Sequence, residues 1–247
     1  MKLTRTAAAA AIALGAFAAA PVHAIPVSVE LALLVDVSGS VSGSEFDLQR
    51  TGYVNAFLDA GIQAAIAGSS GVAATLIYWS SATQQATAVG WSLINDAASA
   101  TTFANAIGAA GRPFSGGTSV DAAINFATPL FSNNGFEGAK LVMDVSGDGT
   151  SNVTNTQAAR DNAAAAGIVI NGLSIGGPGI DAFYQDNVIT GRGFPQPAGG
   201  LPDFGAAVTT KIGREIVGNI PEPSTYALMG LGLGVVGWIA RRRKTQA

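Results

Sequence analysis

Oxygen-bearing side chains that could hold a hard cation stand together directly after the first apolar run of the chain. Asp36, Ser38 and Ser40 occupy alternating positions after residues 29–35. In an extended segment, residues at i, i+2 and i+4 point to the same side, so this spacing gathers one carboxylate and two hydroxyls around one point. Such a donor set suits Mg²⁺, which also keeps several waters. Alone the pattern is weak, because serine-rich turns are common.

Two further loops carry oxygen donors of the same kind. Thr118 follows two glycines just before a predicted helix, where an ordinary N-cap is the alternative interpretation. Asp148 follows a second apolar run at 139–145. If the two apolar strands are parallel neighbours, Asp36 and Asp148 face each other across one edge of the sheet. Two facing carboxylates raise each other's pKa unless a cation lies between them, which again favours a divalent metal.

Strand-like and helix-like patterns alternate along the middle of the chain. This alternation predicts an α/β fold with a doubly wound, mostly parallel central sheet and helices on both faces, in which ligands bind at the carboxyl ends of the strands. A tight connection at Ser80 and Ser81 predicts one antiparallel edge strand. The predicted strands are 29–35, 72–79, 83–91, 139–145 and 167–175, and the predicted helices are 44–58, 98–109, 121–130, 155–166, 180–190 and 203–217. A capping-box-like start is expected at Ser44 and Asp47.

Composition excludes several kinds of chemistry. The chain has no cysteine, and its one histidine, His23, lies in an N-terminal segment expected to be removed. This excludes Ser-His-Asp and Cys-His catalysis, cysteine or histidine zinc sites and haem ligation by histidine. Residues 25–219 contain 15 acids and 7 bases, a formal charge of −8, so no nucleic-acid footprint is present. They are expected to form one domain.

Residues 1–24 have the features of a Sec signal peptide. Lys2 and Arg5 precede an apolar stretch at 7–20, and the segment ends Val22-His23-Ala24, a small-x-small cleavage pattern. An uncleaved membrane anchor is the alternative, but the apolar stretch is shorter than the roughly 20 residues that a bilayer-spanning helix needs. The sequence therefore predicts export and cleavage after residue 24.

The C-terminal segment, residues 220–247, has three parts in a fixed order. Pro221, Glu222 and Pro223 precede an apolar run at 226–240 and a basic cluster at 241–244. The apolar run is short for a stable transmembrane helix but sufficient for a transient one, and the basic cluster keeps the tail cytoplasmic while the domain is outside. The three parts resemble the PEP-CTERM sorting signal of exported Gram-negative proteins. The resemblance implies processing near the Pro-Glu-Pro by an exosortase-type membrane peptidase, and release to the cell surface or extracellular matrix. A simple C-terminal anchor is the alternative.

The ordered set of Asp36, Ser38, Ser40, Thr118 and Asp148 resembles the metal-ion-dependent adhesion site of von Willebrand factor type A domains. The resemblance implies that the serines and the threonine contact Mg²⁺ directly, that the aspartates act directly or through water, and that a partner's carboxylate completes the octahedron. Mn²⁺ and Ca²⁺ are alternative ions. Four further strings, at 45–50, 144–149, 170–173 and 184–188, resemble a bacterial branch of type A domains, DUF1194, whose function is not assigned.

Asp144 opens a competing pattern. Asp144, Ser146 and Asp148 with the following glycine resemble the first half of an EF-hand calcium loop. The twelfth position is Asn155 rather than a bidentate Glu, and a strand precedes the pattern instead of a helix. Asp144 is therefore expected at a strand end, where it orients Ser38 or Ser40 without binding the ion.

Three classes of function remain. The leading hypothesis is a binding module whose exposed Mg²⁺ takes a carboxylate from a surface protein or an exopolysaccharide. The second is a structural protein of an exopolysaccharide or biofilm matrix that does not bind through a metal. The third, a metal-dependent hydrolase, has a metal but no identified base at other strand ends, so we expect no enzyme activity.

Overall fold

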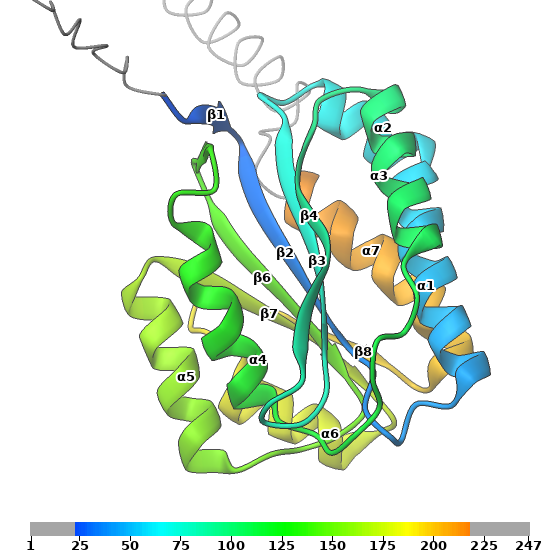
Figure 1. Cartoon of the computed structure of the whole chain (residues 1–247), viewed down its shortest axis with the longest axis vertical. Helices are drawn as coiled ribbons and strands as arrows, with labels where there is room; N and C mark the ends of the chain where they lie inside the picture. Colours follow the sequence, from blue (N-terminus) through cyan, green and yellow to red (C-terminus); the bar gives the residue numbers. More distant parts are fainter. Residues whose placement is uncertain (1–22, 218–247) are drawn as a thin grey trace, which may run out of the picture.

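The computed structural model describes residues 23–217, which form a six-stranded sheet with the strand order β4-β3-β2-β6-β7-β8 (Figure 1). Every neighbouring pair is parallel except β3 and β4. The predicted fold class, a doubly wound, mostly parallel sheet with one antiparallel edge strand, is confirmed. The strands are β2 (Val29–Asp36), β3 (Val72–Trp79), β4 (Gln85–Ile94), β6 (Leu141–Gly147), β7 (Ile168–Ile175) and β8 (Pro195–Ala198); β1 (Ile25–Val27) and β5 (Phe136–Gly138) form a separate parallel pair.

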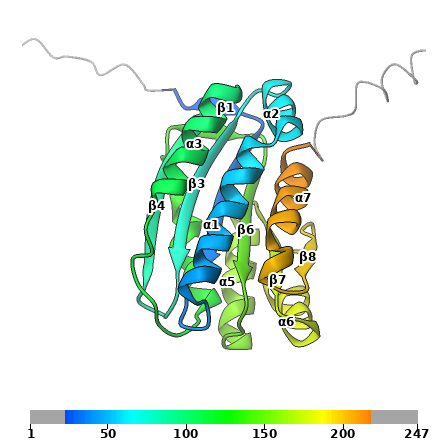
Figure 2. The same cartoon turned by 90° about the vertical axis from the view of Figure 1, so that its right-hand side faces the viewer.

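Helices cover both faces of the sheet (Figures 1 and 2). The central strand β2 is buried along its whole length, as its uninterrupted apolar run predicts for a strand covered on both sides. Leu31 and Leu33 pack toward one group of helices, and Ala32 and Leu34 pack toward the other. The first group is α1 (Gly43–Leu58), α2 (Ala60–Ala67), α3 (Ala97–Ala109) and α7 (Phe204–Val217); the second is α4 (Val120–Ala127), α5 (Val153–Ala165) and α6 (Pro178–Phe183).

Two predicted helices change type before their predicted ends. The helix predicted at 121–130 ends at Ala127 and continues as a 3₁₀ turn, Thr128–Phe131, in which Pro129 cannot donate a helical hydrogen bond. The helix predicted at 180–190 is α6 followed by one π-helical turn, Tyr184–Val188.

The capping box of α1 lies two residues earlier than predicted. The Ser42 hydroxyl accepts a hydrogen bond from the Glu45 backbone N–H at 3.3 Å, and the Glu45 carboxylate accepts one from the Ser42 N–H at 2.7 Å. Glutamate has the longer side chain needed to reach back to the cap, so this pair, rather than Ser44 and Asp47, begins the helix.

Within residues 23–217, five elements were not predicted: α2, β1, β5, the 3₁₀ turn Leu201–Asp203, and β8. The last carries Pro195 and Pro197, which argue against a central strand but are tolerated at a sheet edge, where β8 pairs only with β7 in the described sheet. Short edge elements of this kind depend on tertiary pairing more than on local sequence pattern.

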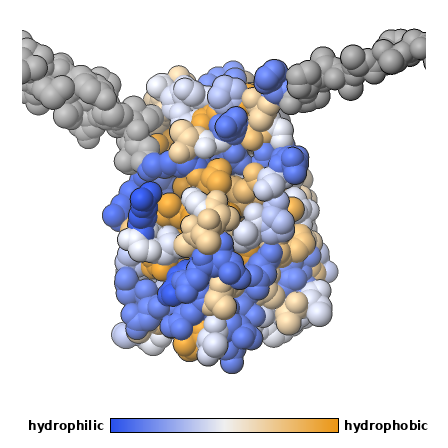
Figure 3. Space-filling model, turned by 90° about the vertical axis from the view of Figure 1, so that its left-hand side faces the viewer, coloured by the Kyte–Doolittle hydropathy of each residue, from blue (hydrophilic) through white to orange (hydrophobic). Residues whose placement is uncertain are grey.

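The described chain begins and ends at the same edge of the sheet, the edge formed by the amino ends of the parallel strands. β1 and the last turn of α7 both lie there, at the top of Figures 1 and 2. Seen from the left of Figure 1, hydrophilic side chains cover most of the lower half of the surface (Figure 3). The predicted signal peptide, the Pro-Glu-Pro motif and the predicted transmembrane helix at 226–240 fall outside the described residues. Between residues 23 and 217, no helix is long and apolar enough to cross a bilayer.

Candidate metal site at the carboxyl edge of the sheet

The structure brings the five predicted site residues together at the carboxyl edge of the sheet. The Ser38 and Ser40 hydroxyl oxygens lie 3.0 Å apart, and the Ser40 hydroxyl donates to Asp148 Oδ1 at 2.7 Å. Asp36 Oδ1 accepts a hydrogen bond from the Ser38 backbone N–H at 2.7 Å. Thr118 completes the cluster: a Cβ placed on Gly149, next to Asp148, would lie 3.2 Å from the Thr118 hydroxyl oxygen.

Asp36 is the most constrained member of the cluster. Its side chain is buried, and within the described chain its Oδ2 has no hydrogen-bond partner. Burial raises the pKa of Asp36 to about 7; the Ser38 hydrogen bonds oppose this shift and the nearby Asp148 charge adds to it. A buried carboxylate oxygen without a partner is costly, and a bound cation would remove that cost.

The floor of the site is tightly packed around Gly147. A Cβ at this position would lie 2.5 Å from Tyr184 Oη, 2.9 Å from Asp36 Oδ2 and 3.1 Å from the Trp79 ring. Tyr184 is buried, and its pKa is raised well above the usual value, first by burial and then by the charges of Asp36 and Asp148. Glycine at position 147 therefore lets the chain pass directly over the aspartate and the two aromatic rings.

Exposure increases from the floor of the site outward. Asp36 and Ser38 are buried, Thr118 and Asp148 are half-buried, and Ser40 is exposed. The site therefore opens to solvent on one side and is closed by protein on the other.

Thr118 is not the cap of the helix that follows it. The N-cap of α4 is Ser119, whose hydroxyl donates to Asp121 Oδ1 at 2.9 Å and makes no capping hydrogen bond. Among the described residues the Thr118 hydroxyl makes no hydrogen bond. The ordinary-cap interpretation does not fit, and the hydroxyl is left facing the Asp148-Gly149 turn.

Several contacts that sequence reasoning missed hold the first two of the three loops in place. The Arg112 guanidinium donates to the carbonyls of Val37 at 2.8 Å and Ser38 at 2.7 Å. The Gly39 N–H donates to the Gly116 carbonyl at 2.7 Å, which joins the first loop to the second. The Ser80 hydroxyl, at the end of β3, donates to the Gly117 carbonyl at 2.9 Å. These contacts link positions far apart in the chain, so no local spacing signals them.

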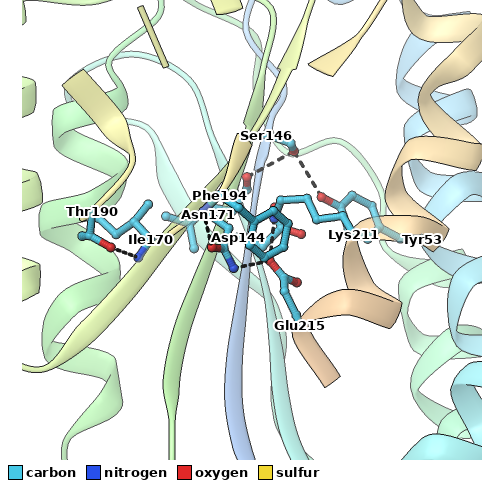
Figure 4. Close-up of polar contacts among 10 residues, drawn as sticks. Tyr53, Asp144, Ser146, Ile170, Asn171, Thr190, Phe194, Lys211 and Glu215 are labelled. Carbon is cyan, nitrogen blue, oxygen red and sulfur yellow. Dashed lines mark hydrogen bonds and ion pairs between the residues drawn. The ribbon is translucent and has the colours of Figure 1, made fainter. Parts of the chain in front are cut away.

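Asp144 lies elsewhere than predicted (Figure 4). Its buried carboxylate pairs with Lys211 Nζ of α7 at 2.5 Å, and Lys211 also pairs with Glu215 at 2.7 Å. The prediction that Asp144 orients Ser38 or Ser40 is therefore not met by its described contacts. Successive residues of β6 face opposite sides: Met143 and Val145 pack in the cluster covered by α4, α5 and α6, and Asp144 faces α7 inside the core. The EF-hand arrangement is not formed, because the Asp144 carboxylate pairs with Lys211 and does not join Asp148 in one site.

Burial dominates the ionisation of this internal cluster. It raises the pKa of Asp144 even though the Lys211 charge opposes the shift, and it raises the pKa of Glu215 to about 7, again against Lys211 and with a contribution from Asp144. The cluster also includes Asn171, whose amide donates to Glu215 at 2.8 Å and accepts from the Phe194 N–H at 3.0 Å. It ties α7 to β6, β7 and the segment before β8.

The donor chemistry of the carboxyl-edge site is specific. It offers hydroxyl and carboxylate oxygens only, a set suited to hard divalent cations such as Mg²⁺, Mn²⁺ or Ca²⁺. Throughout residues 23–217, no three or more His, Cys, Asp or Glu side chains form a group that could hold a metal ion. Any ion held here would therefore rely on the hydroxyls of Ser38, Ser40 and Thr118, and the residues present fit that requirement.

A doubly wound sheet of this topology is the fold of von Willebrand factor type A domains, and solved structures bear this out. Proximal thread matrix protein 1 from the mussel byssus is similar over 77% of this chain and 47% of its own, with a TM-score of 0.57 and 12% identity. The pilus adhesin SpaC of Lactobacillus rhamnosus GG is similar over 76% of this chain and 30% of its own, with a TM-score of 0.57 and 16% identity. A von Willebrand factor type A structure from Catenulispora acidiphila is similar over 76% of this chain and 42% of its own, with a TM-score of 0.55 and 12% identity. This chain spans about half the length of the mussel protein, and these likenesses show the fold alone.

The chain belongs to the DUF1194 family, a type A-like family described as proteins of unknown function, whose model matches residues 26–220. Residues 219–244 match the PEP-CTERM protein-sorting motif. The resemblances to the DUF1194 branch of type A domains and to the PEP-CTERM signal are thus confirmed, and together they define an exported type A-like protein with a sorting signal. No curated protein matches the chain.

Proposed function

We propose that residues 25–219 form an exported, non-catalytic binding module that holds Mg²⁺ at the carboxyl edge and binds a carboxylate of a surface protein or exopolysaccharide. Ser38, Ser40 and Thr118 would hold the ion, with Asp36 and Asp148 acting directly or through water. When bound, the ion supplies a concentrated positive charge for an anionic partner group. The observation that carries the proposal is Asp36 Oδ2, a buried oxygen without a hydrogen-bond partner in the described chain.

Two of the similar proteins favour a binding function over catalysis. One, proximal thread matrix protein 1, has a structure with a zinc-occupied MIDAS motif, at 12% identity and a TM-score of 0.54, and the other is a pilus adhesin. Mn²⁺ and Ca²⁺ are the alternative ions for this chain, because the same oxygen donors accept them.

Two processing steps belong to the proposal. The signal peptide, residues 1–24, would be removed on export. Residues 220–247 would anchor the protein transiently in the inner membrane of a Gram-negative bacterium, through 226–240, until an exosortase-type peptidase cuts near Pro221, Glu222 and Pro223. The described chain ends at the edge opposite the candidate site (Figure 2), so the site would face away from the membrane. The intact mass of the surface-released protein tests both cleavages; a mass that includes either segment contradicts that step.

Metal binding is tested with single-hydroxyl variants of the exported protein. We expect calorimetric titration to show Mg²⁺ binding, and Ser40→Ala or Thr118→Ala to weaken it by at least about tenfold, because each removes one oxygen donor. Ser70→Ala and Thr102→Ala are the matched controls, since both residues are exposed and lie outside the site. Both site variants should remain folded, because their side chains lie in surface loops. Equal Mg²⁺ affinity in Ser40→Ala and wild type would contradict the ligand assignment.

Partner binding is tested by capture from the native cell envelope. We expect capture in Mg²⁺, loss in EDTA, and loss with Thr118→Ala but not with Thr102→Ala. Capture that is the same in Mg²⁺ and EDTA would contradict metal-dependent binding. If Asp36→Ala lowers the melting temperature yet leaves capture and surface retention intact, the domain is a structural matrix component instead.

A further inference from the structure

The basic residues of the domain divide into two groups by their partners. Residues 25–219 contain seven bases. Four are engaged: Arg50 with Asp47, Arg160 with Asp161, Lys211 with Asp144 and Glu215, and Arg112 with two loop carbonyls. The other three are Lys140, Arg192 and Arg214, and none of them forms an ion pair with an acid of the described chain.

These three bases line a single cavity of about 370 Å³ between β6, β7 and α7. Lys140 immediately precedes β6, Arg192 lies between β7 and β8, and Arg214 lies in the last turn of α7. The cavity is at the amino ends of the strands, so it lies on the opposite edge from the candidate metal site. Three positive charges without acidic partners are thus gathered in one place on a domain whose formal charge is −8.

The cavity is built in a way that favours an anion. The Arg214 guanidinium lies 3.8 Å from the Phe194 ring centroid, and this stacking orients its donors without neutralising its charge. Glu215 also lines the cavity, but its Oε1 accepts hydrogen bonds from Lys211 at 2.7 Å and Asn171 at 2.8 Å. Partial desolvation lowers the pKa of Lys140, although the residue is exposed. Like charges brought together repel, and an anion among them would relieve that repulsion.

We propose that this cavity binds the phosphate group of an organic phosphate. Two guanidinium groups suit the oxygens of a phosphate, each able to donate two parallel hydrogen bonds. The volume exceeds that of a bare phosphate and falls within the range of small-molecule sites. Leu141, Val142 and Val169 supply an apolar wall, and an adjoining hollow of about 420 Å³ shares Val169 and Arg192 with the cavity. The ligand therefore carries an organic portion beside its phosphate.

The position of the cavity suggests two sources for such a group. It lies on the edge where α7 ends (Figures 1 and 2), and the sorting signal follows from residue 219. While the tail is in the membrane, phospholipid headgroups are close to this edge; after release, a soluble phosphate ester is the available form. Only the lipid source depends on the processing proposed above, whereas neither source requires the metal site.

The test uses the exported chain and two kinds of probe. Glycerol phosphate, titrated by calorimetry, represents the soluble source. Glycerol is the uncharged comparison, and glucuronate is the comparison that carries a carboxylate. Vesicles of phosphatidylglycerol in phosphatidylcholine, assayed by co-sedimentation, represent the lipid source. Arg192→Gln/Arg214→Gln is compared with Arg50→Gln/Arg160→Gln, which removes the same charge from other surface positions.

We expect the first double variant to weaken binding of at least one phosphate probe by about tenfold or more, and the control double variant to change it by less than about twofold. Comparing equal-charge variants separates the cavity from any general electrostatic effect of the lost positive charge on binding to anionic vesicles. Lys140→Gln should give a smaller loss in the same direction. The proposal is overturned if neither phosphate probe binds, if both double variants behave alike, or if glucuronate binds as tightly as glycerol phosphate.

Discussion

Replacing Lys211 with methionine tests whether one buried cation holds α7 against the sheet. Lys211 is fully buried and lies between the carboxylates of Asp144 and Glu215, at 2.5 and 2.7 Å (Figure 4). Lys211→Met keeps most of the side-chain volume but removes the cation that pairs with both of these acids. Each acid must then stay protonated in the folded state or remain charged without the Lys211 counter-ion.

The expected cost follows from this geometry. Breaking a buried ion pair by removing one partner costs about 3–5 kcal/mol. For a domain of 150–250 residues, each kcal/mol corresponds to roughly 2–4 °C in melting temperature, so Lys211→Met should lower the midpoint by roughly 6–20 °C near pH 7.5. The loss should be smaller at pH 5, because protons can then replace the missing cation on Asp144 and Glu215.

Thermal and urea unfolding of the exported chain at pH 5 and pH 7.5 measure both effects. Lys140→Met is the matched control: this lysine is exposed, and its replacement should change the free energy of unfolding by no more than about 0.5 kcal/mol. A Lys211→Met variant within about 1 kcal/mol of wild type at both pH values would show that the buried pair contributes little. A loss of equal size at both pH values would show that protonation of the acids does not replace the cation.

Three further perturbations address the site and the core. Gly147→Ala should displace Asp36 or Tyr184, lower the free energy of unfolding by about 1–3 kcal/mol and weaken Mg²⁺ binding. The control is Gly43→Ala, whose Cβ meets nothing within 4 Å. Unchanged Mg²⁺ affinity in Gly147→Ala would contradict the packing argument. Arg112 is not a proposed ligand, but its two carbonyl contacts hold the first loop. Arg112→Gln should therefore weaken Mg²⁺ binding in calorimetry. Wild-type Mg²⁺ affinity in this variant would show that the loop needs no such support. The pKa of Glu215 is raised from 4.5 to about 7. Between these pH values the folded state retains a proton that the unfolded state has lost. This contribution to stability is therefore fully present below pH 4.5 and disappears as pH rises toward 7. Glu215→Gln should therefore flatten the fall in the free energy of unfolding between pH 5 and pH 7 in urea titrations, and an unchanged slope would contradict the shift.

The sequence predicted the features that local patterns encode. Strand β2 could be recognised because an uninterrupted apolar run is typical of a strand covered on both faces. Asp36 and Asp148 could be placed at one edge because each follows such a run and parallel strands share their carboxyl edge. The clustering of the five candidate residues therefore follows from the order of elements and the spacing of a few polar side chains. Their binding of a metal stays a prediction.

What the sequence did not predict depends on contacts between distant segments. Asp144 is two residues before Ser146 on the same face of β6, yet its partner comes from α7, at Lys211. A lysine in an amphipathic helix is normally assigned to the solvent side, and only the packing of α7 on β6 shows that this one is inside. Arg112 gave no signal for the same reason, since its carbonyl partners belong to a loop about 75 residues earlier.

The separation of the two candidate sites follows from topology. In a doubly wound sheet, each parallel strand runs to the carboxyl edge and the following helix returns to the amino edge. A domain that begins with a strand and ends with a helix therefore has both ends at the amino edge, as β1 and α7 do here. The oxygen-rich site, built from loops after β2 and β6, lies on the opposite edge, whereas the cavity lined by Lys140, Arg192 and Arg214 lies on the edge that continues into the sorting signal. Removing that signal should thus change the surroundings of the basic cavity and leave the geometry of the oxygen-rich site unaltered.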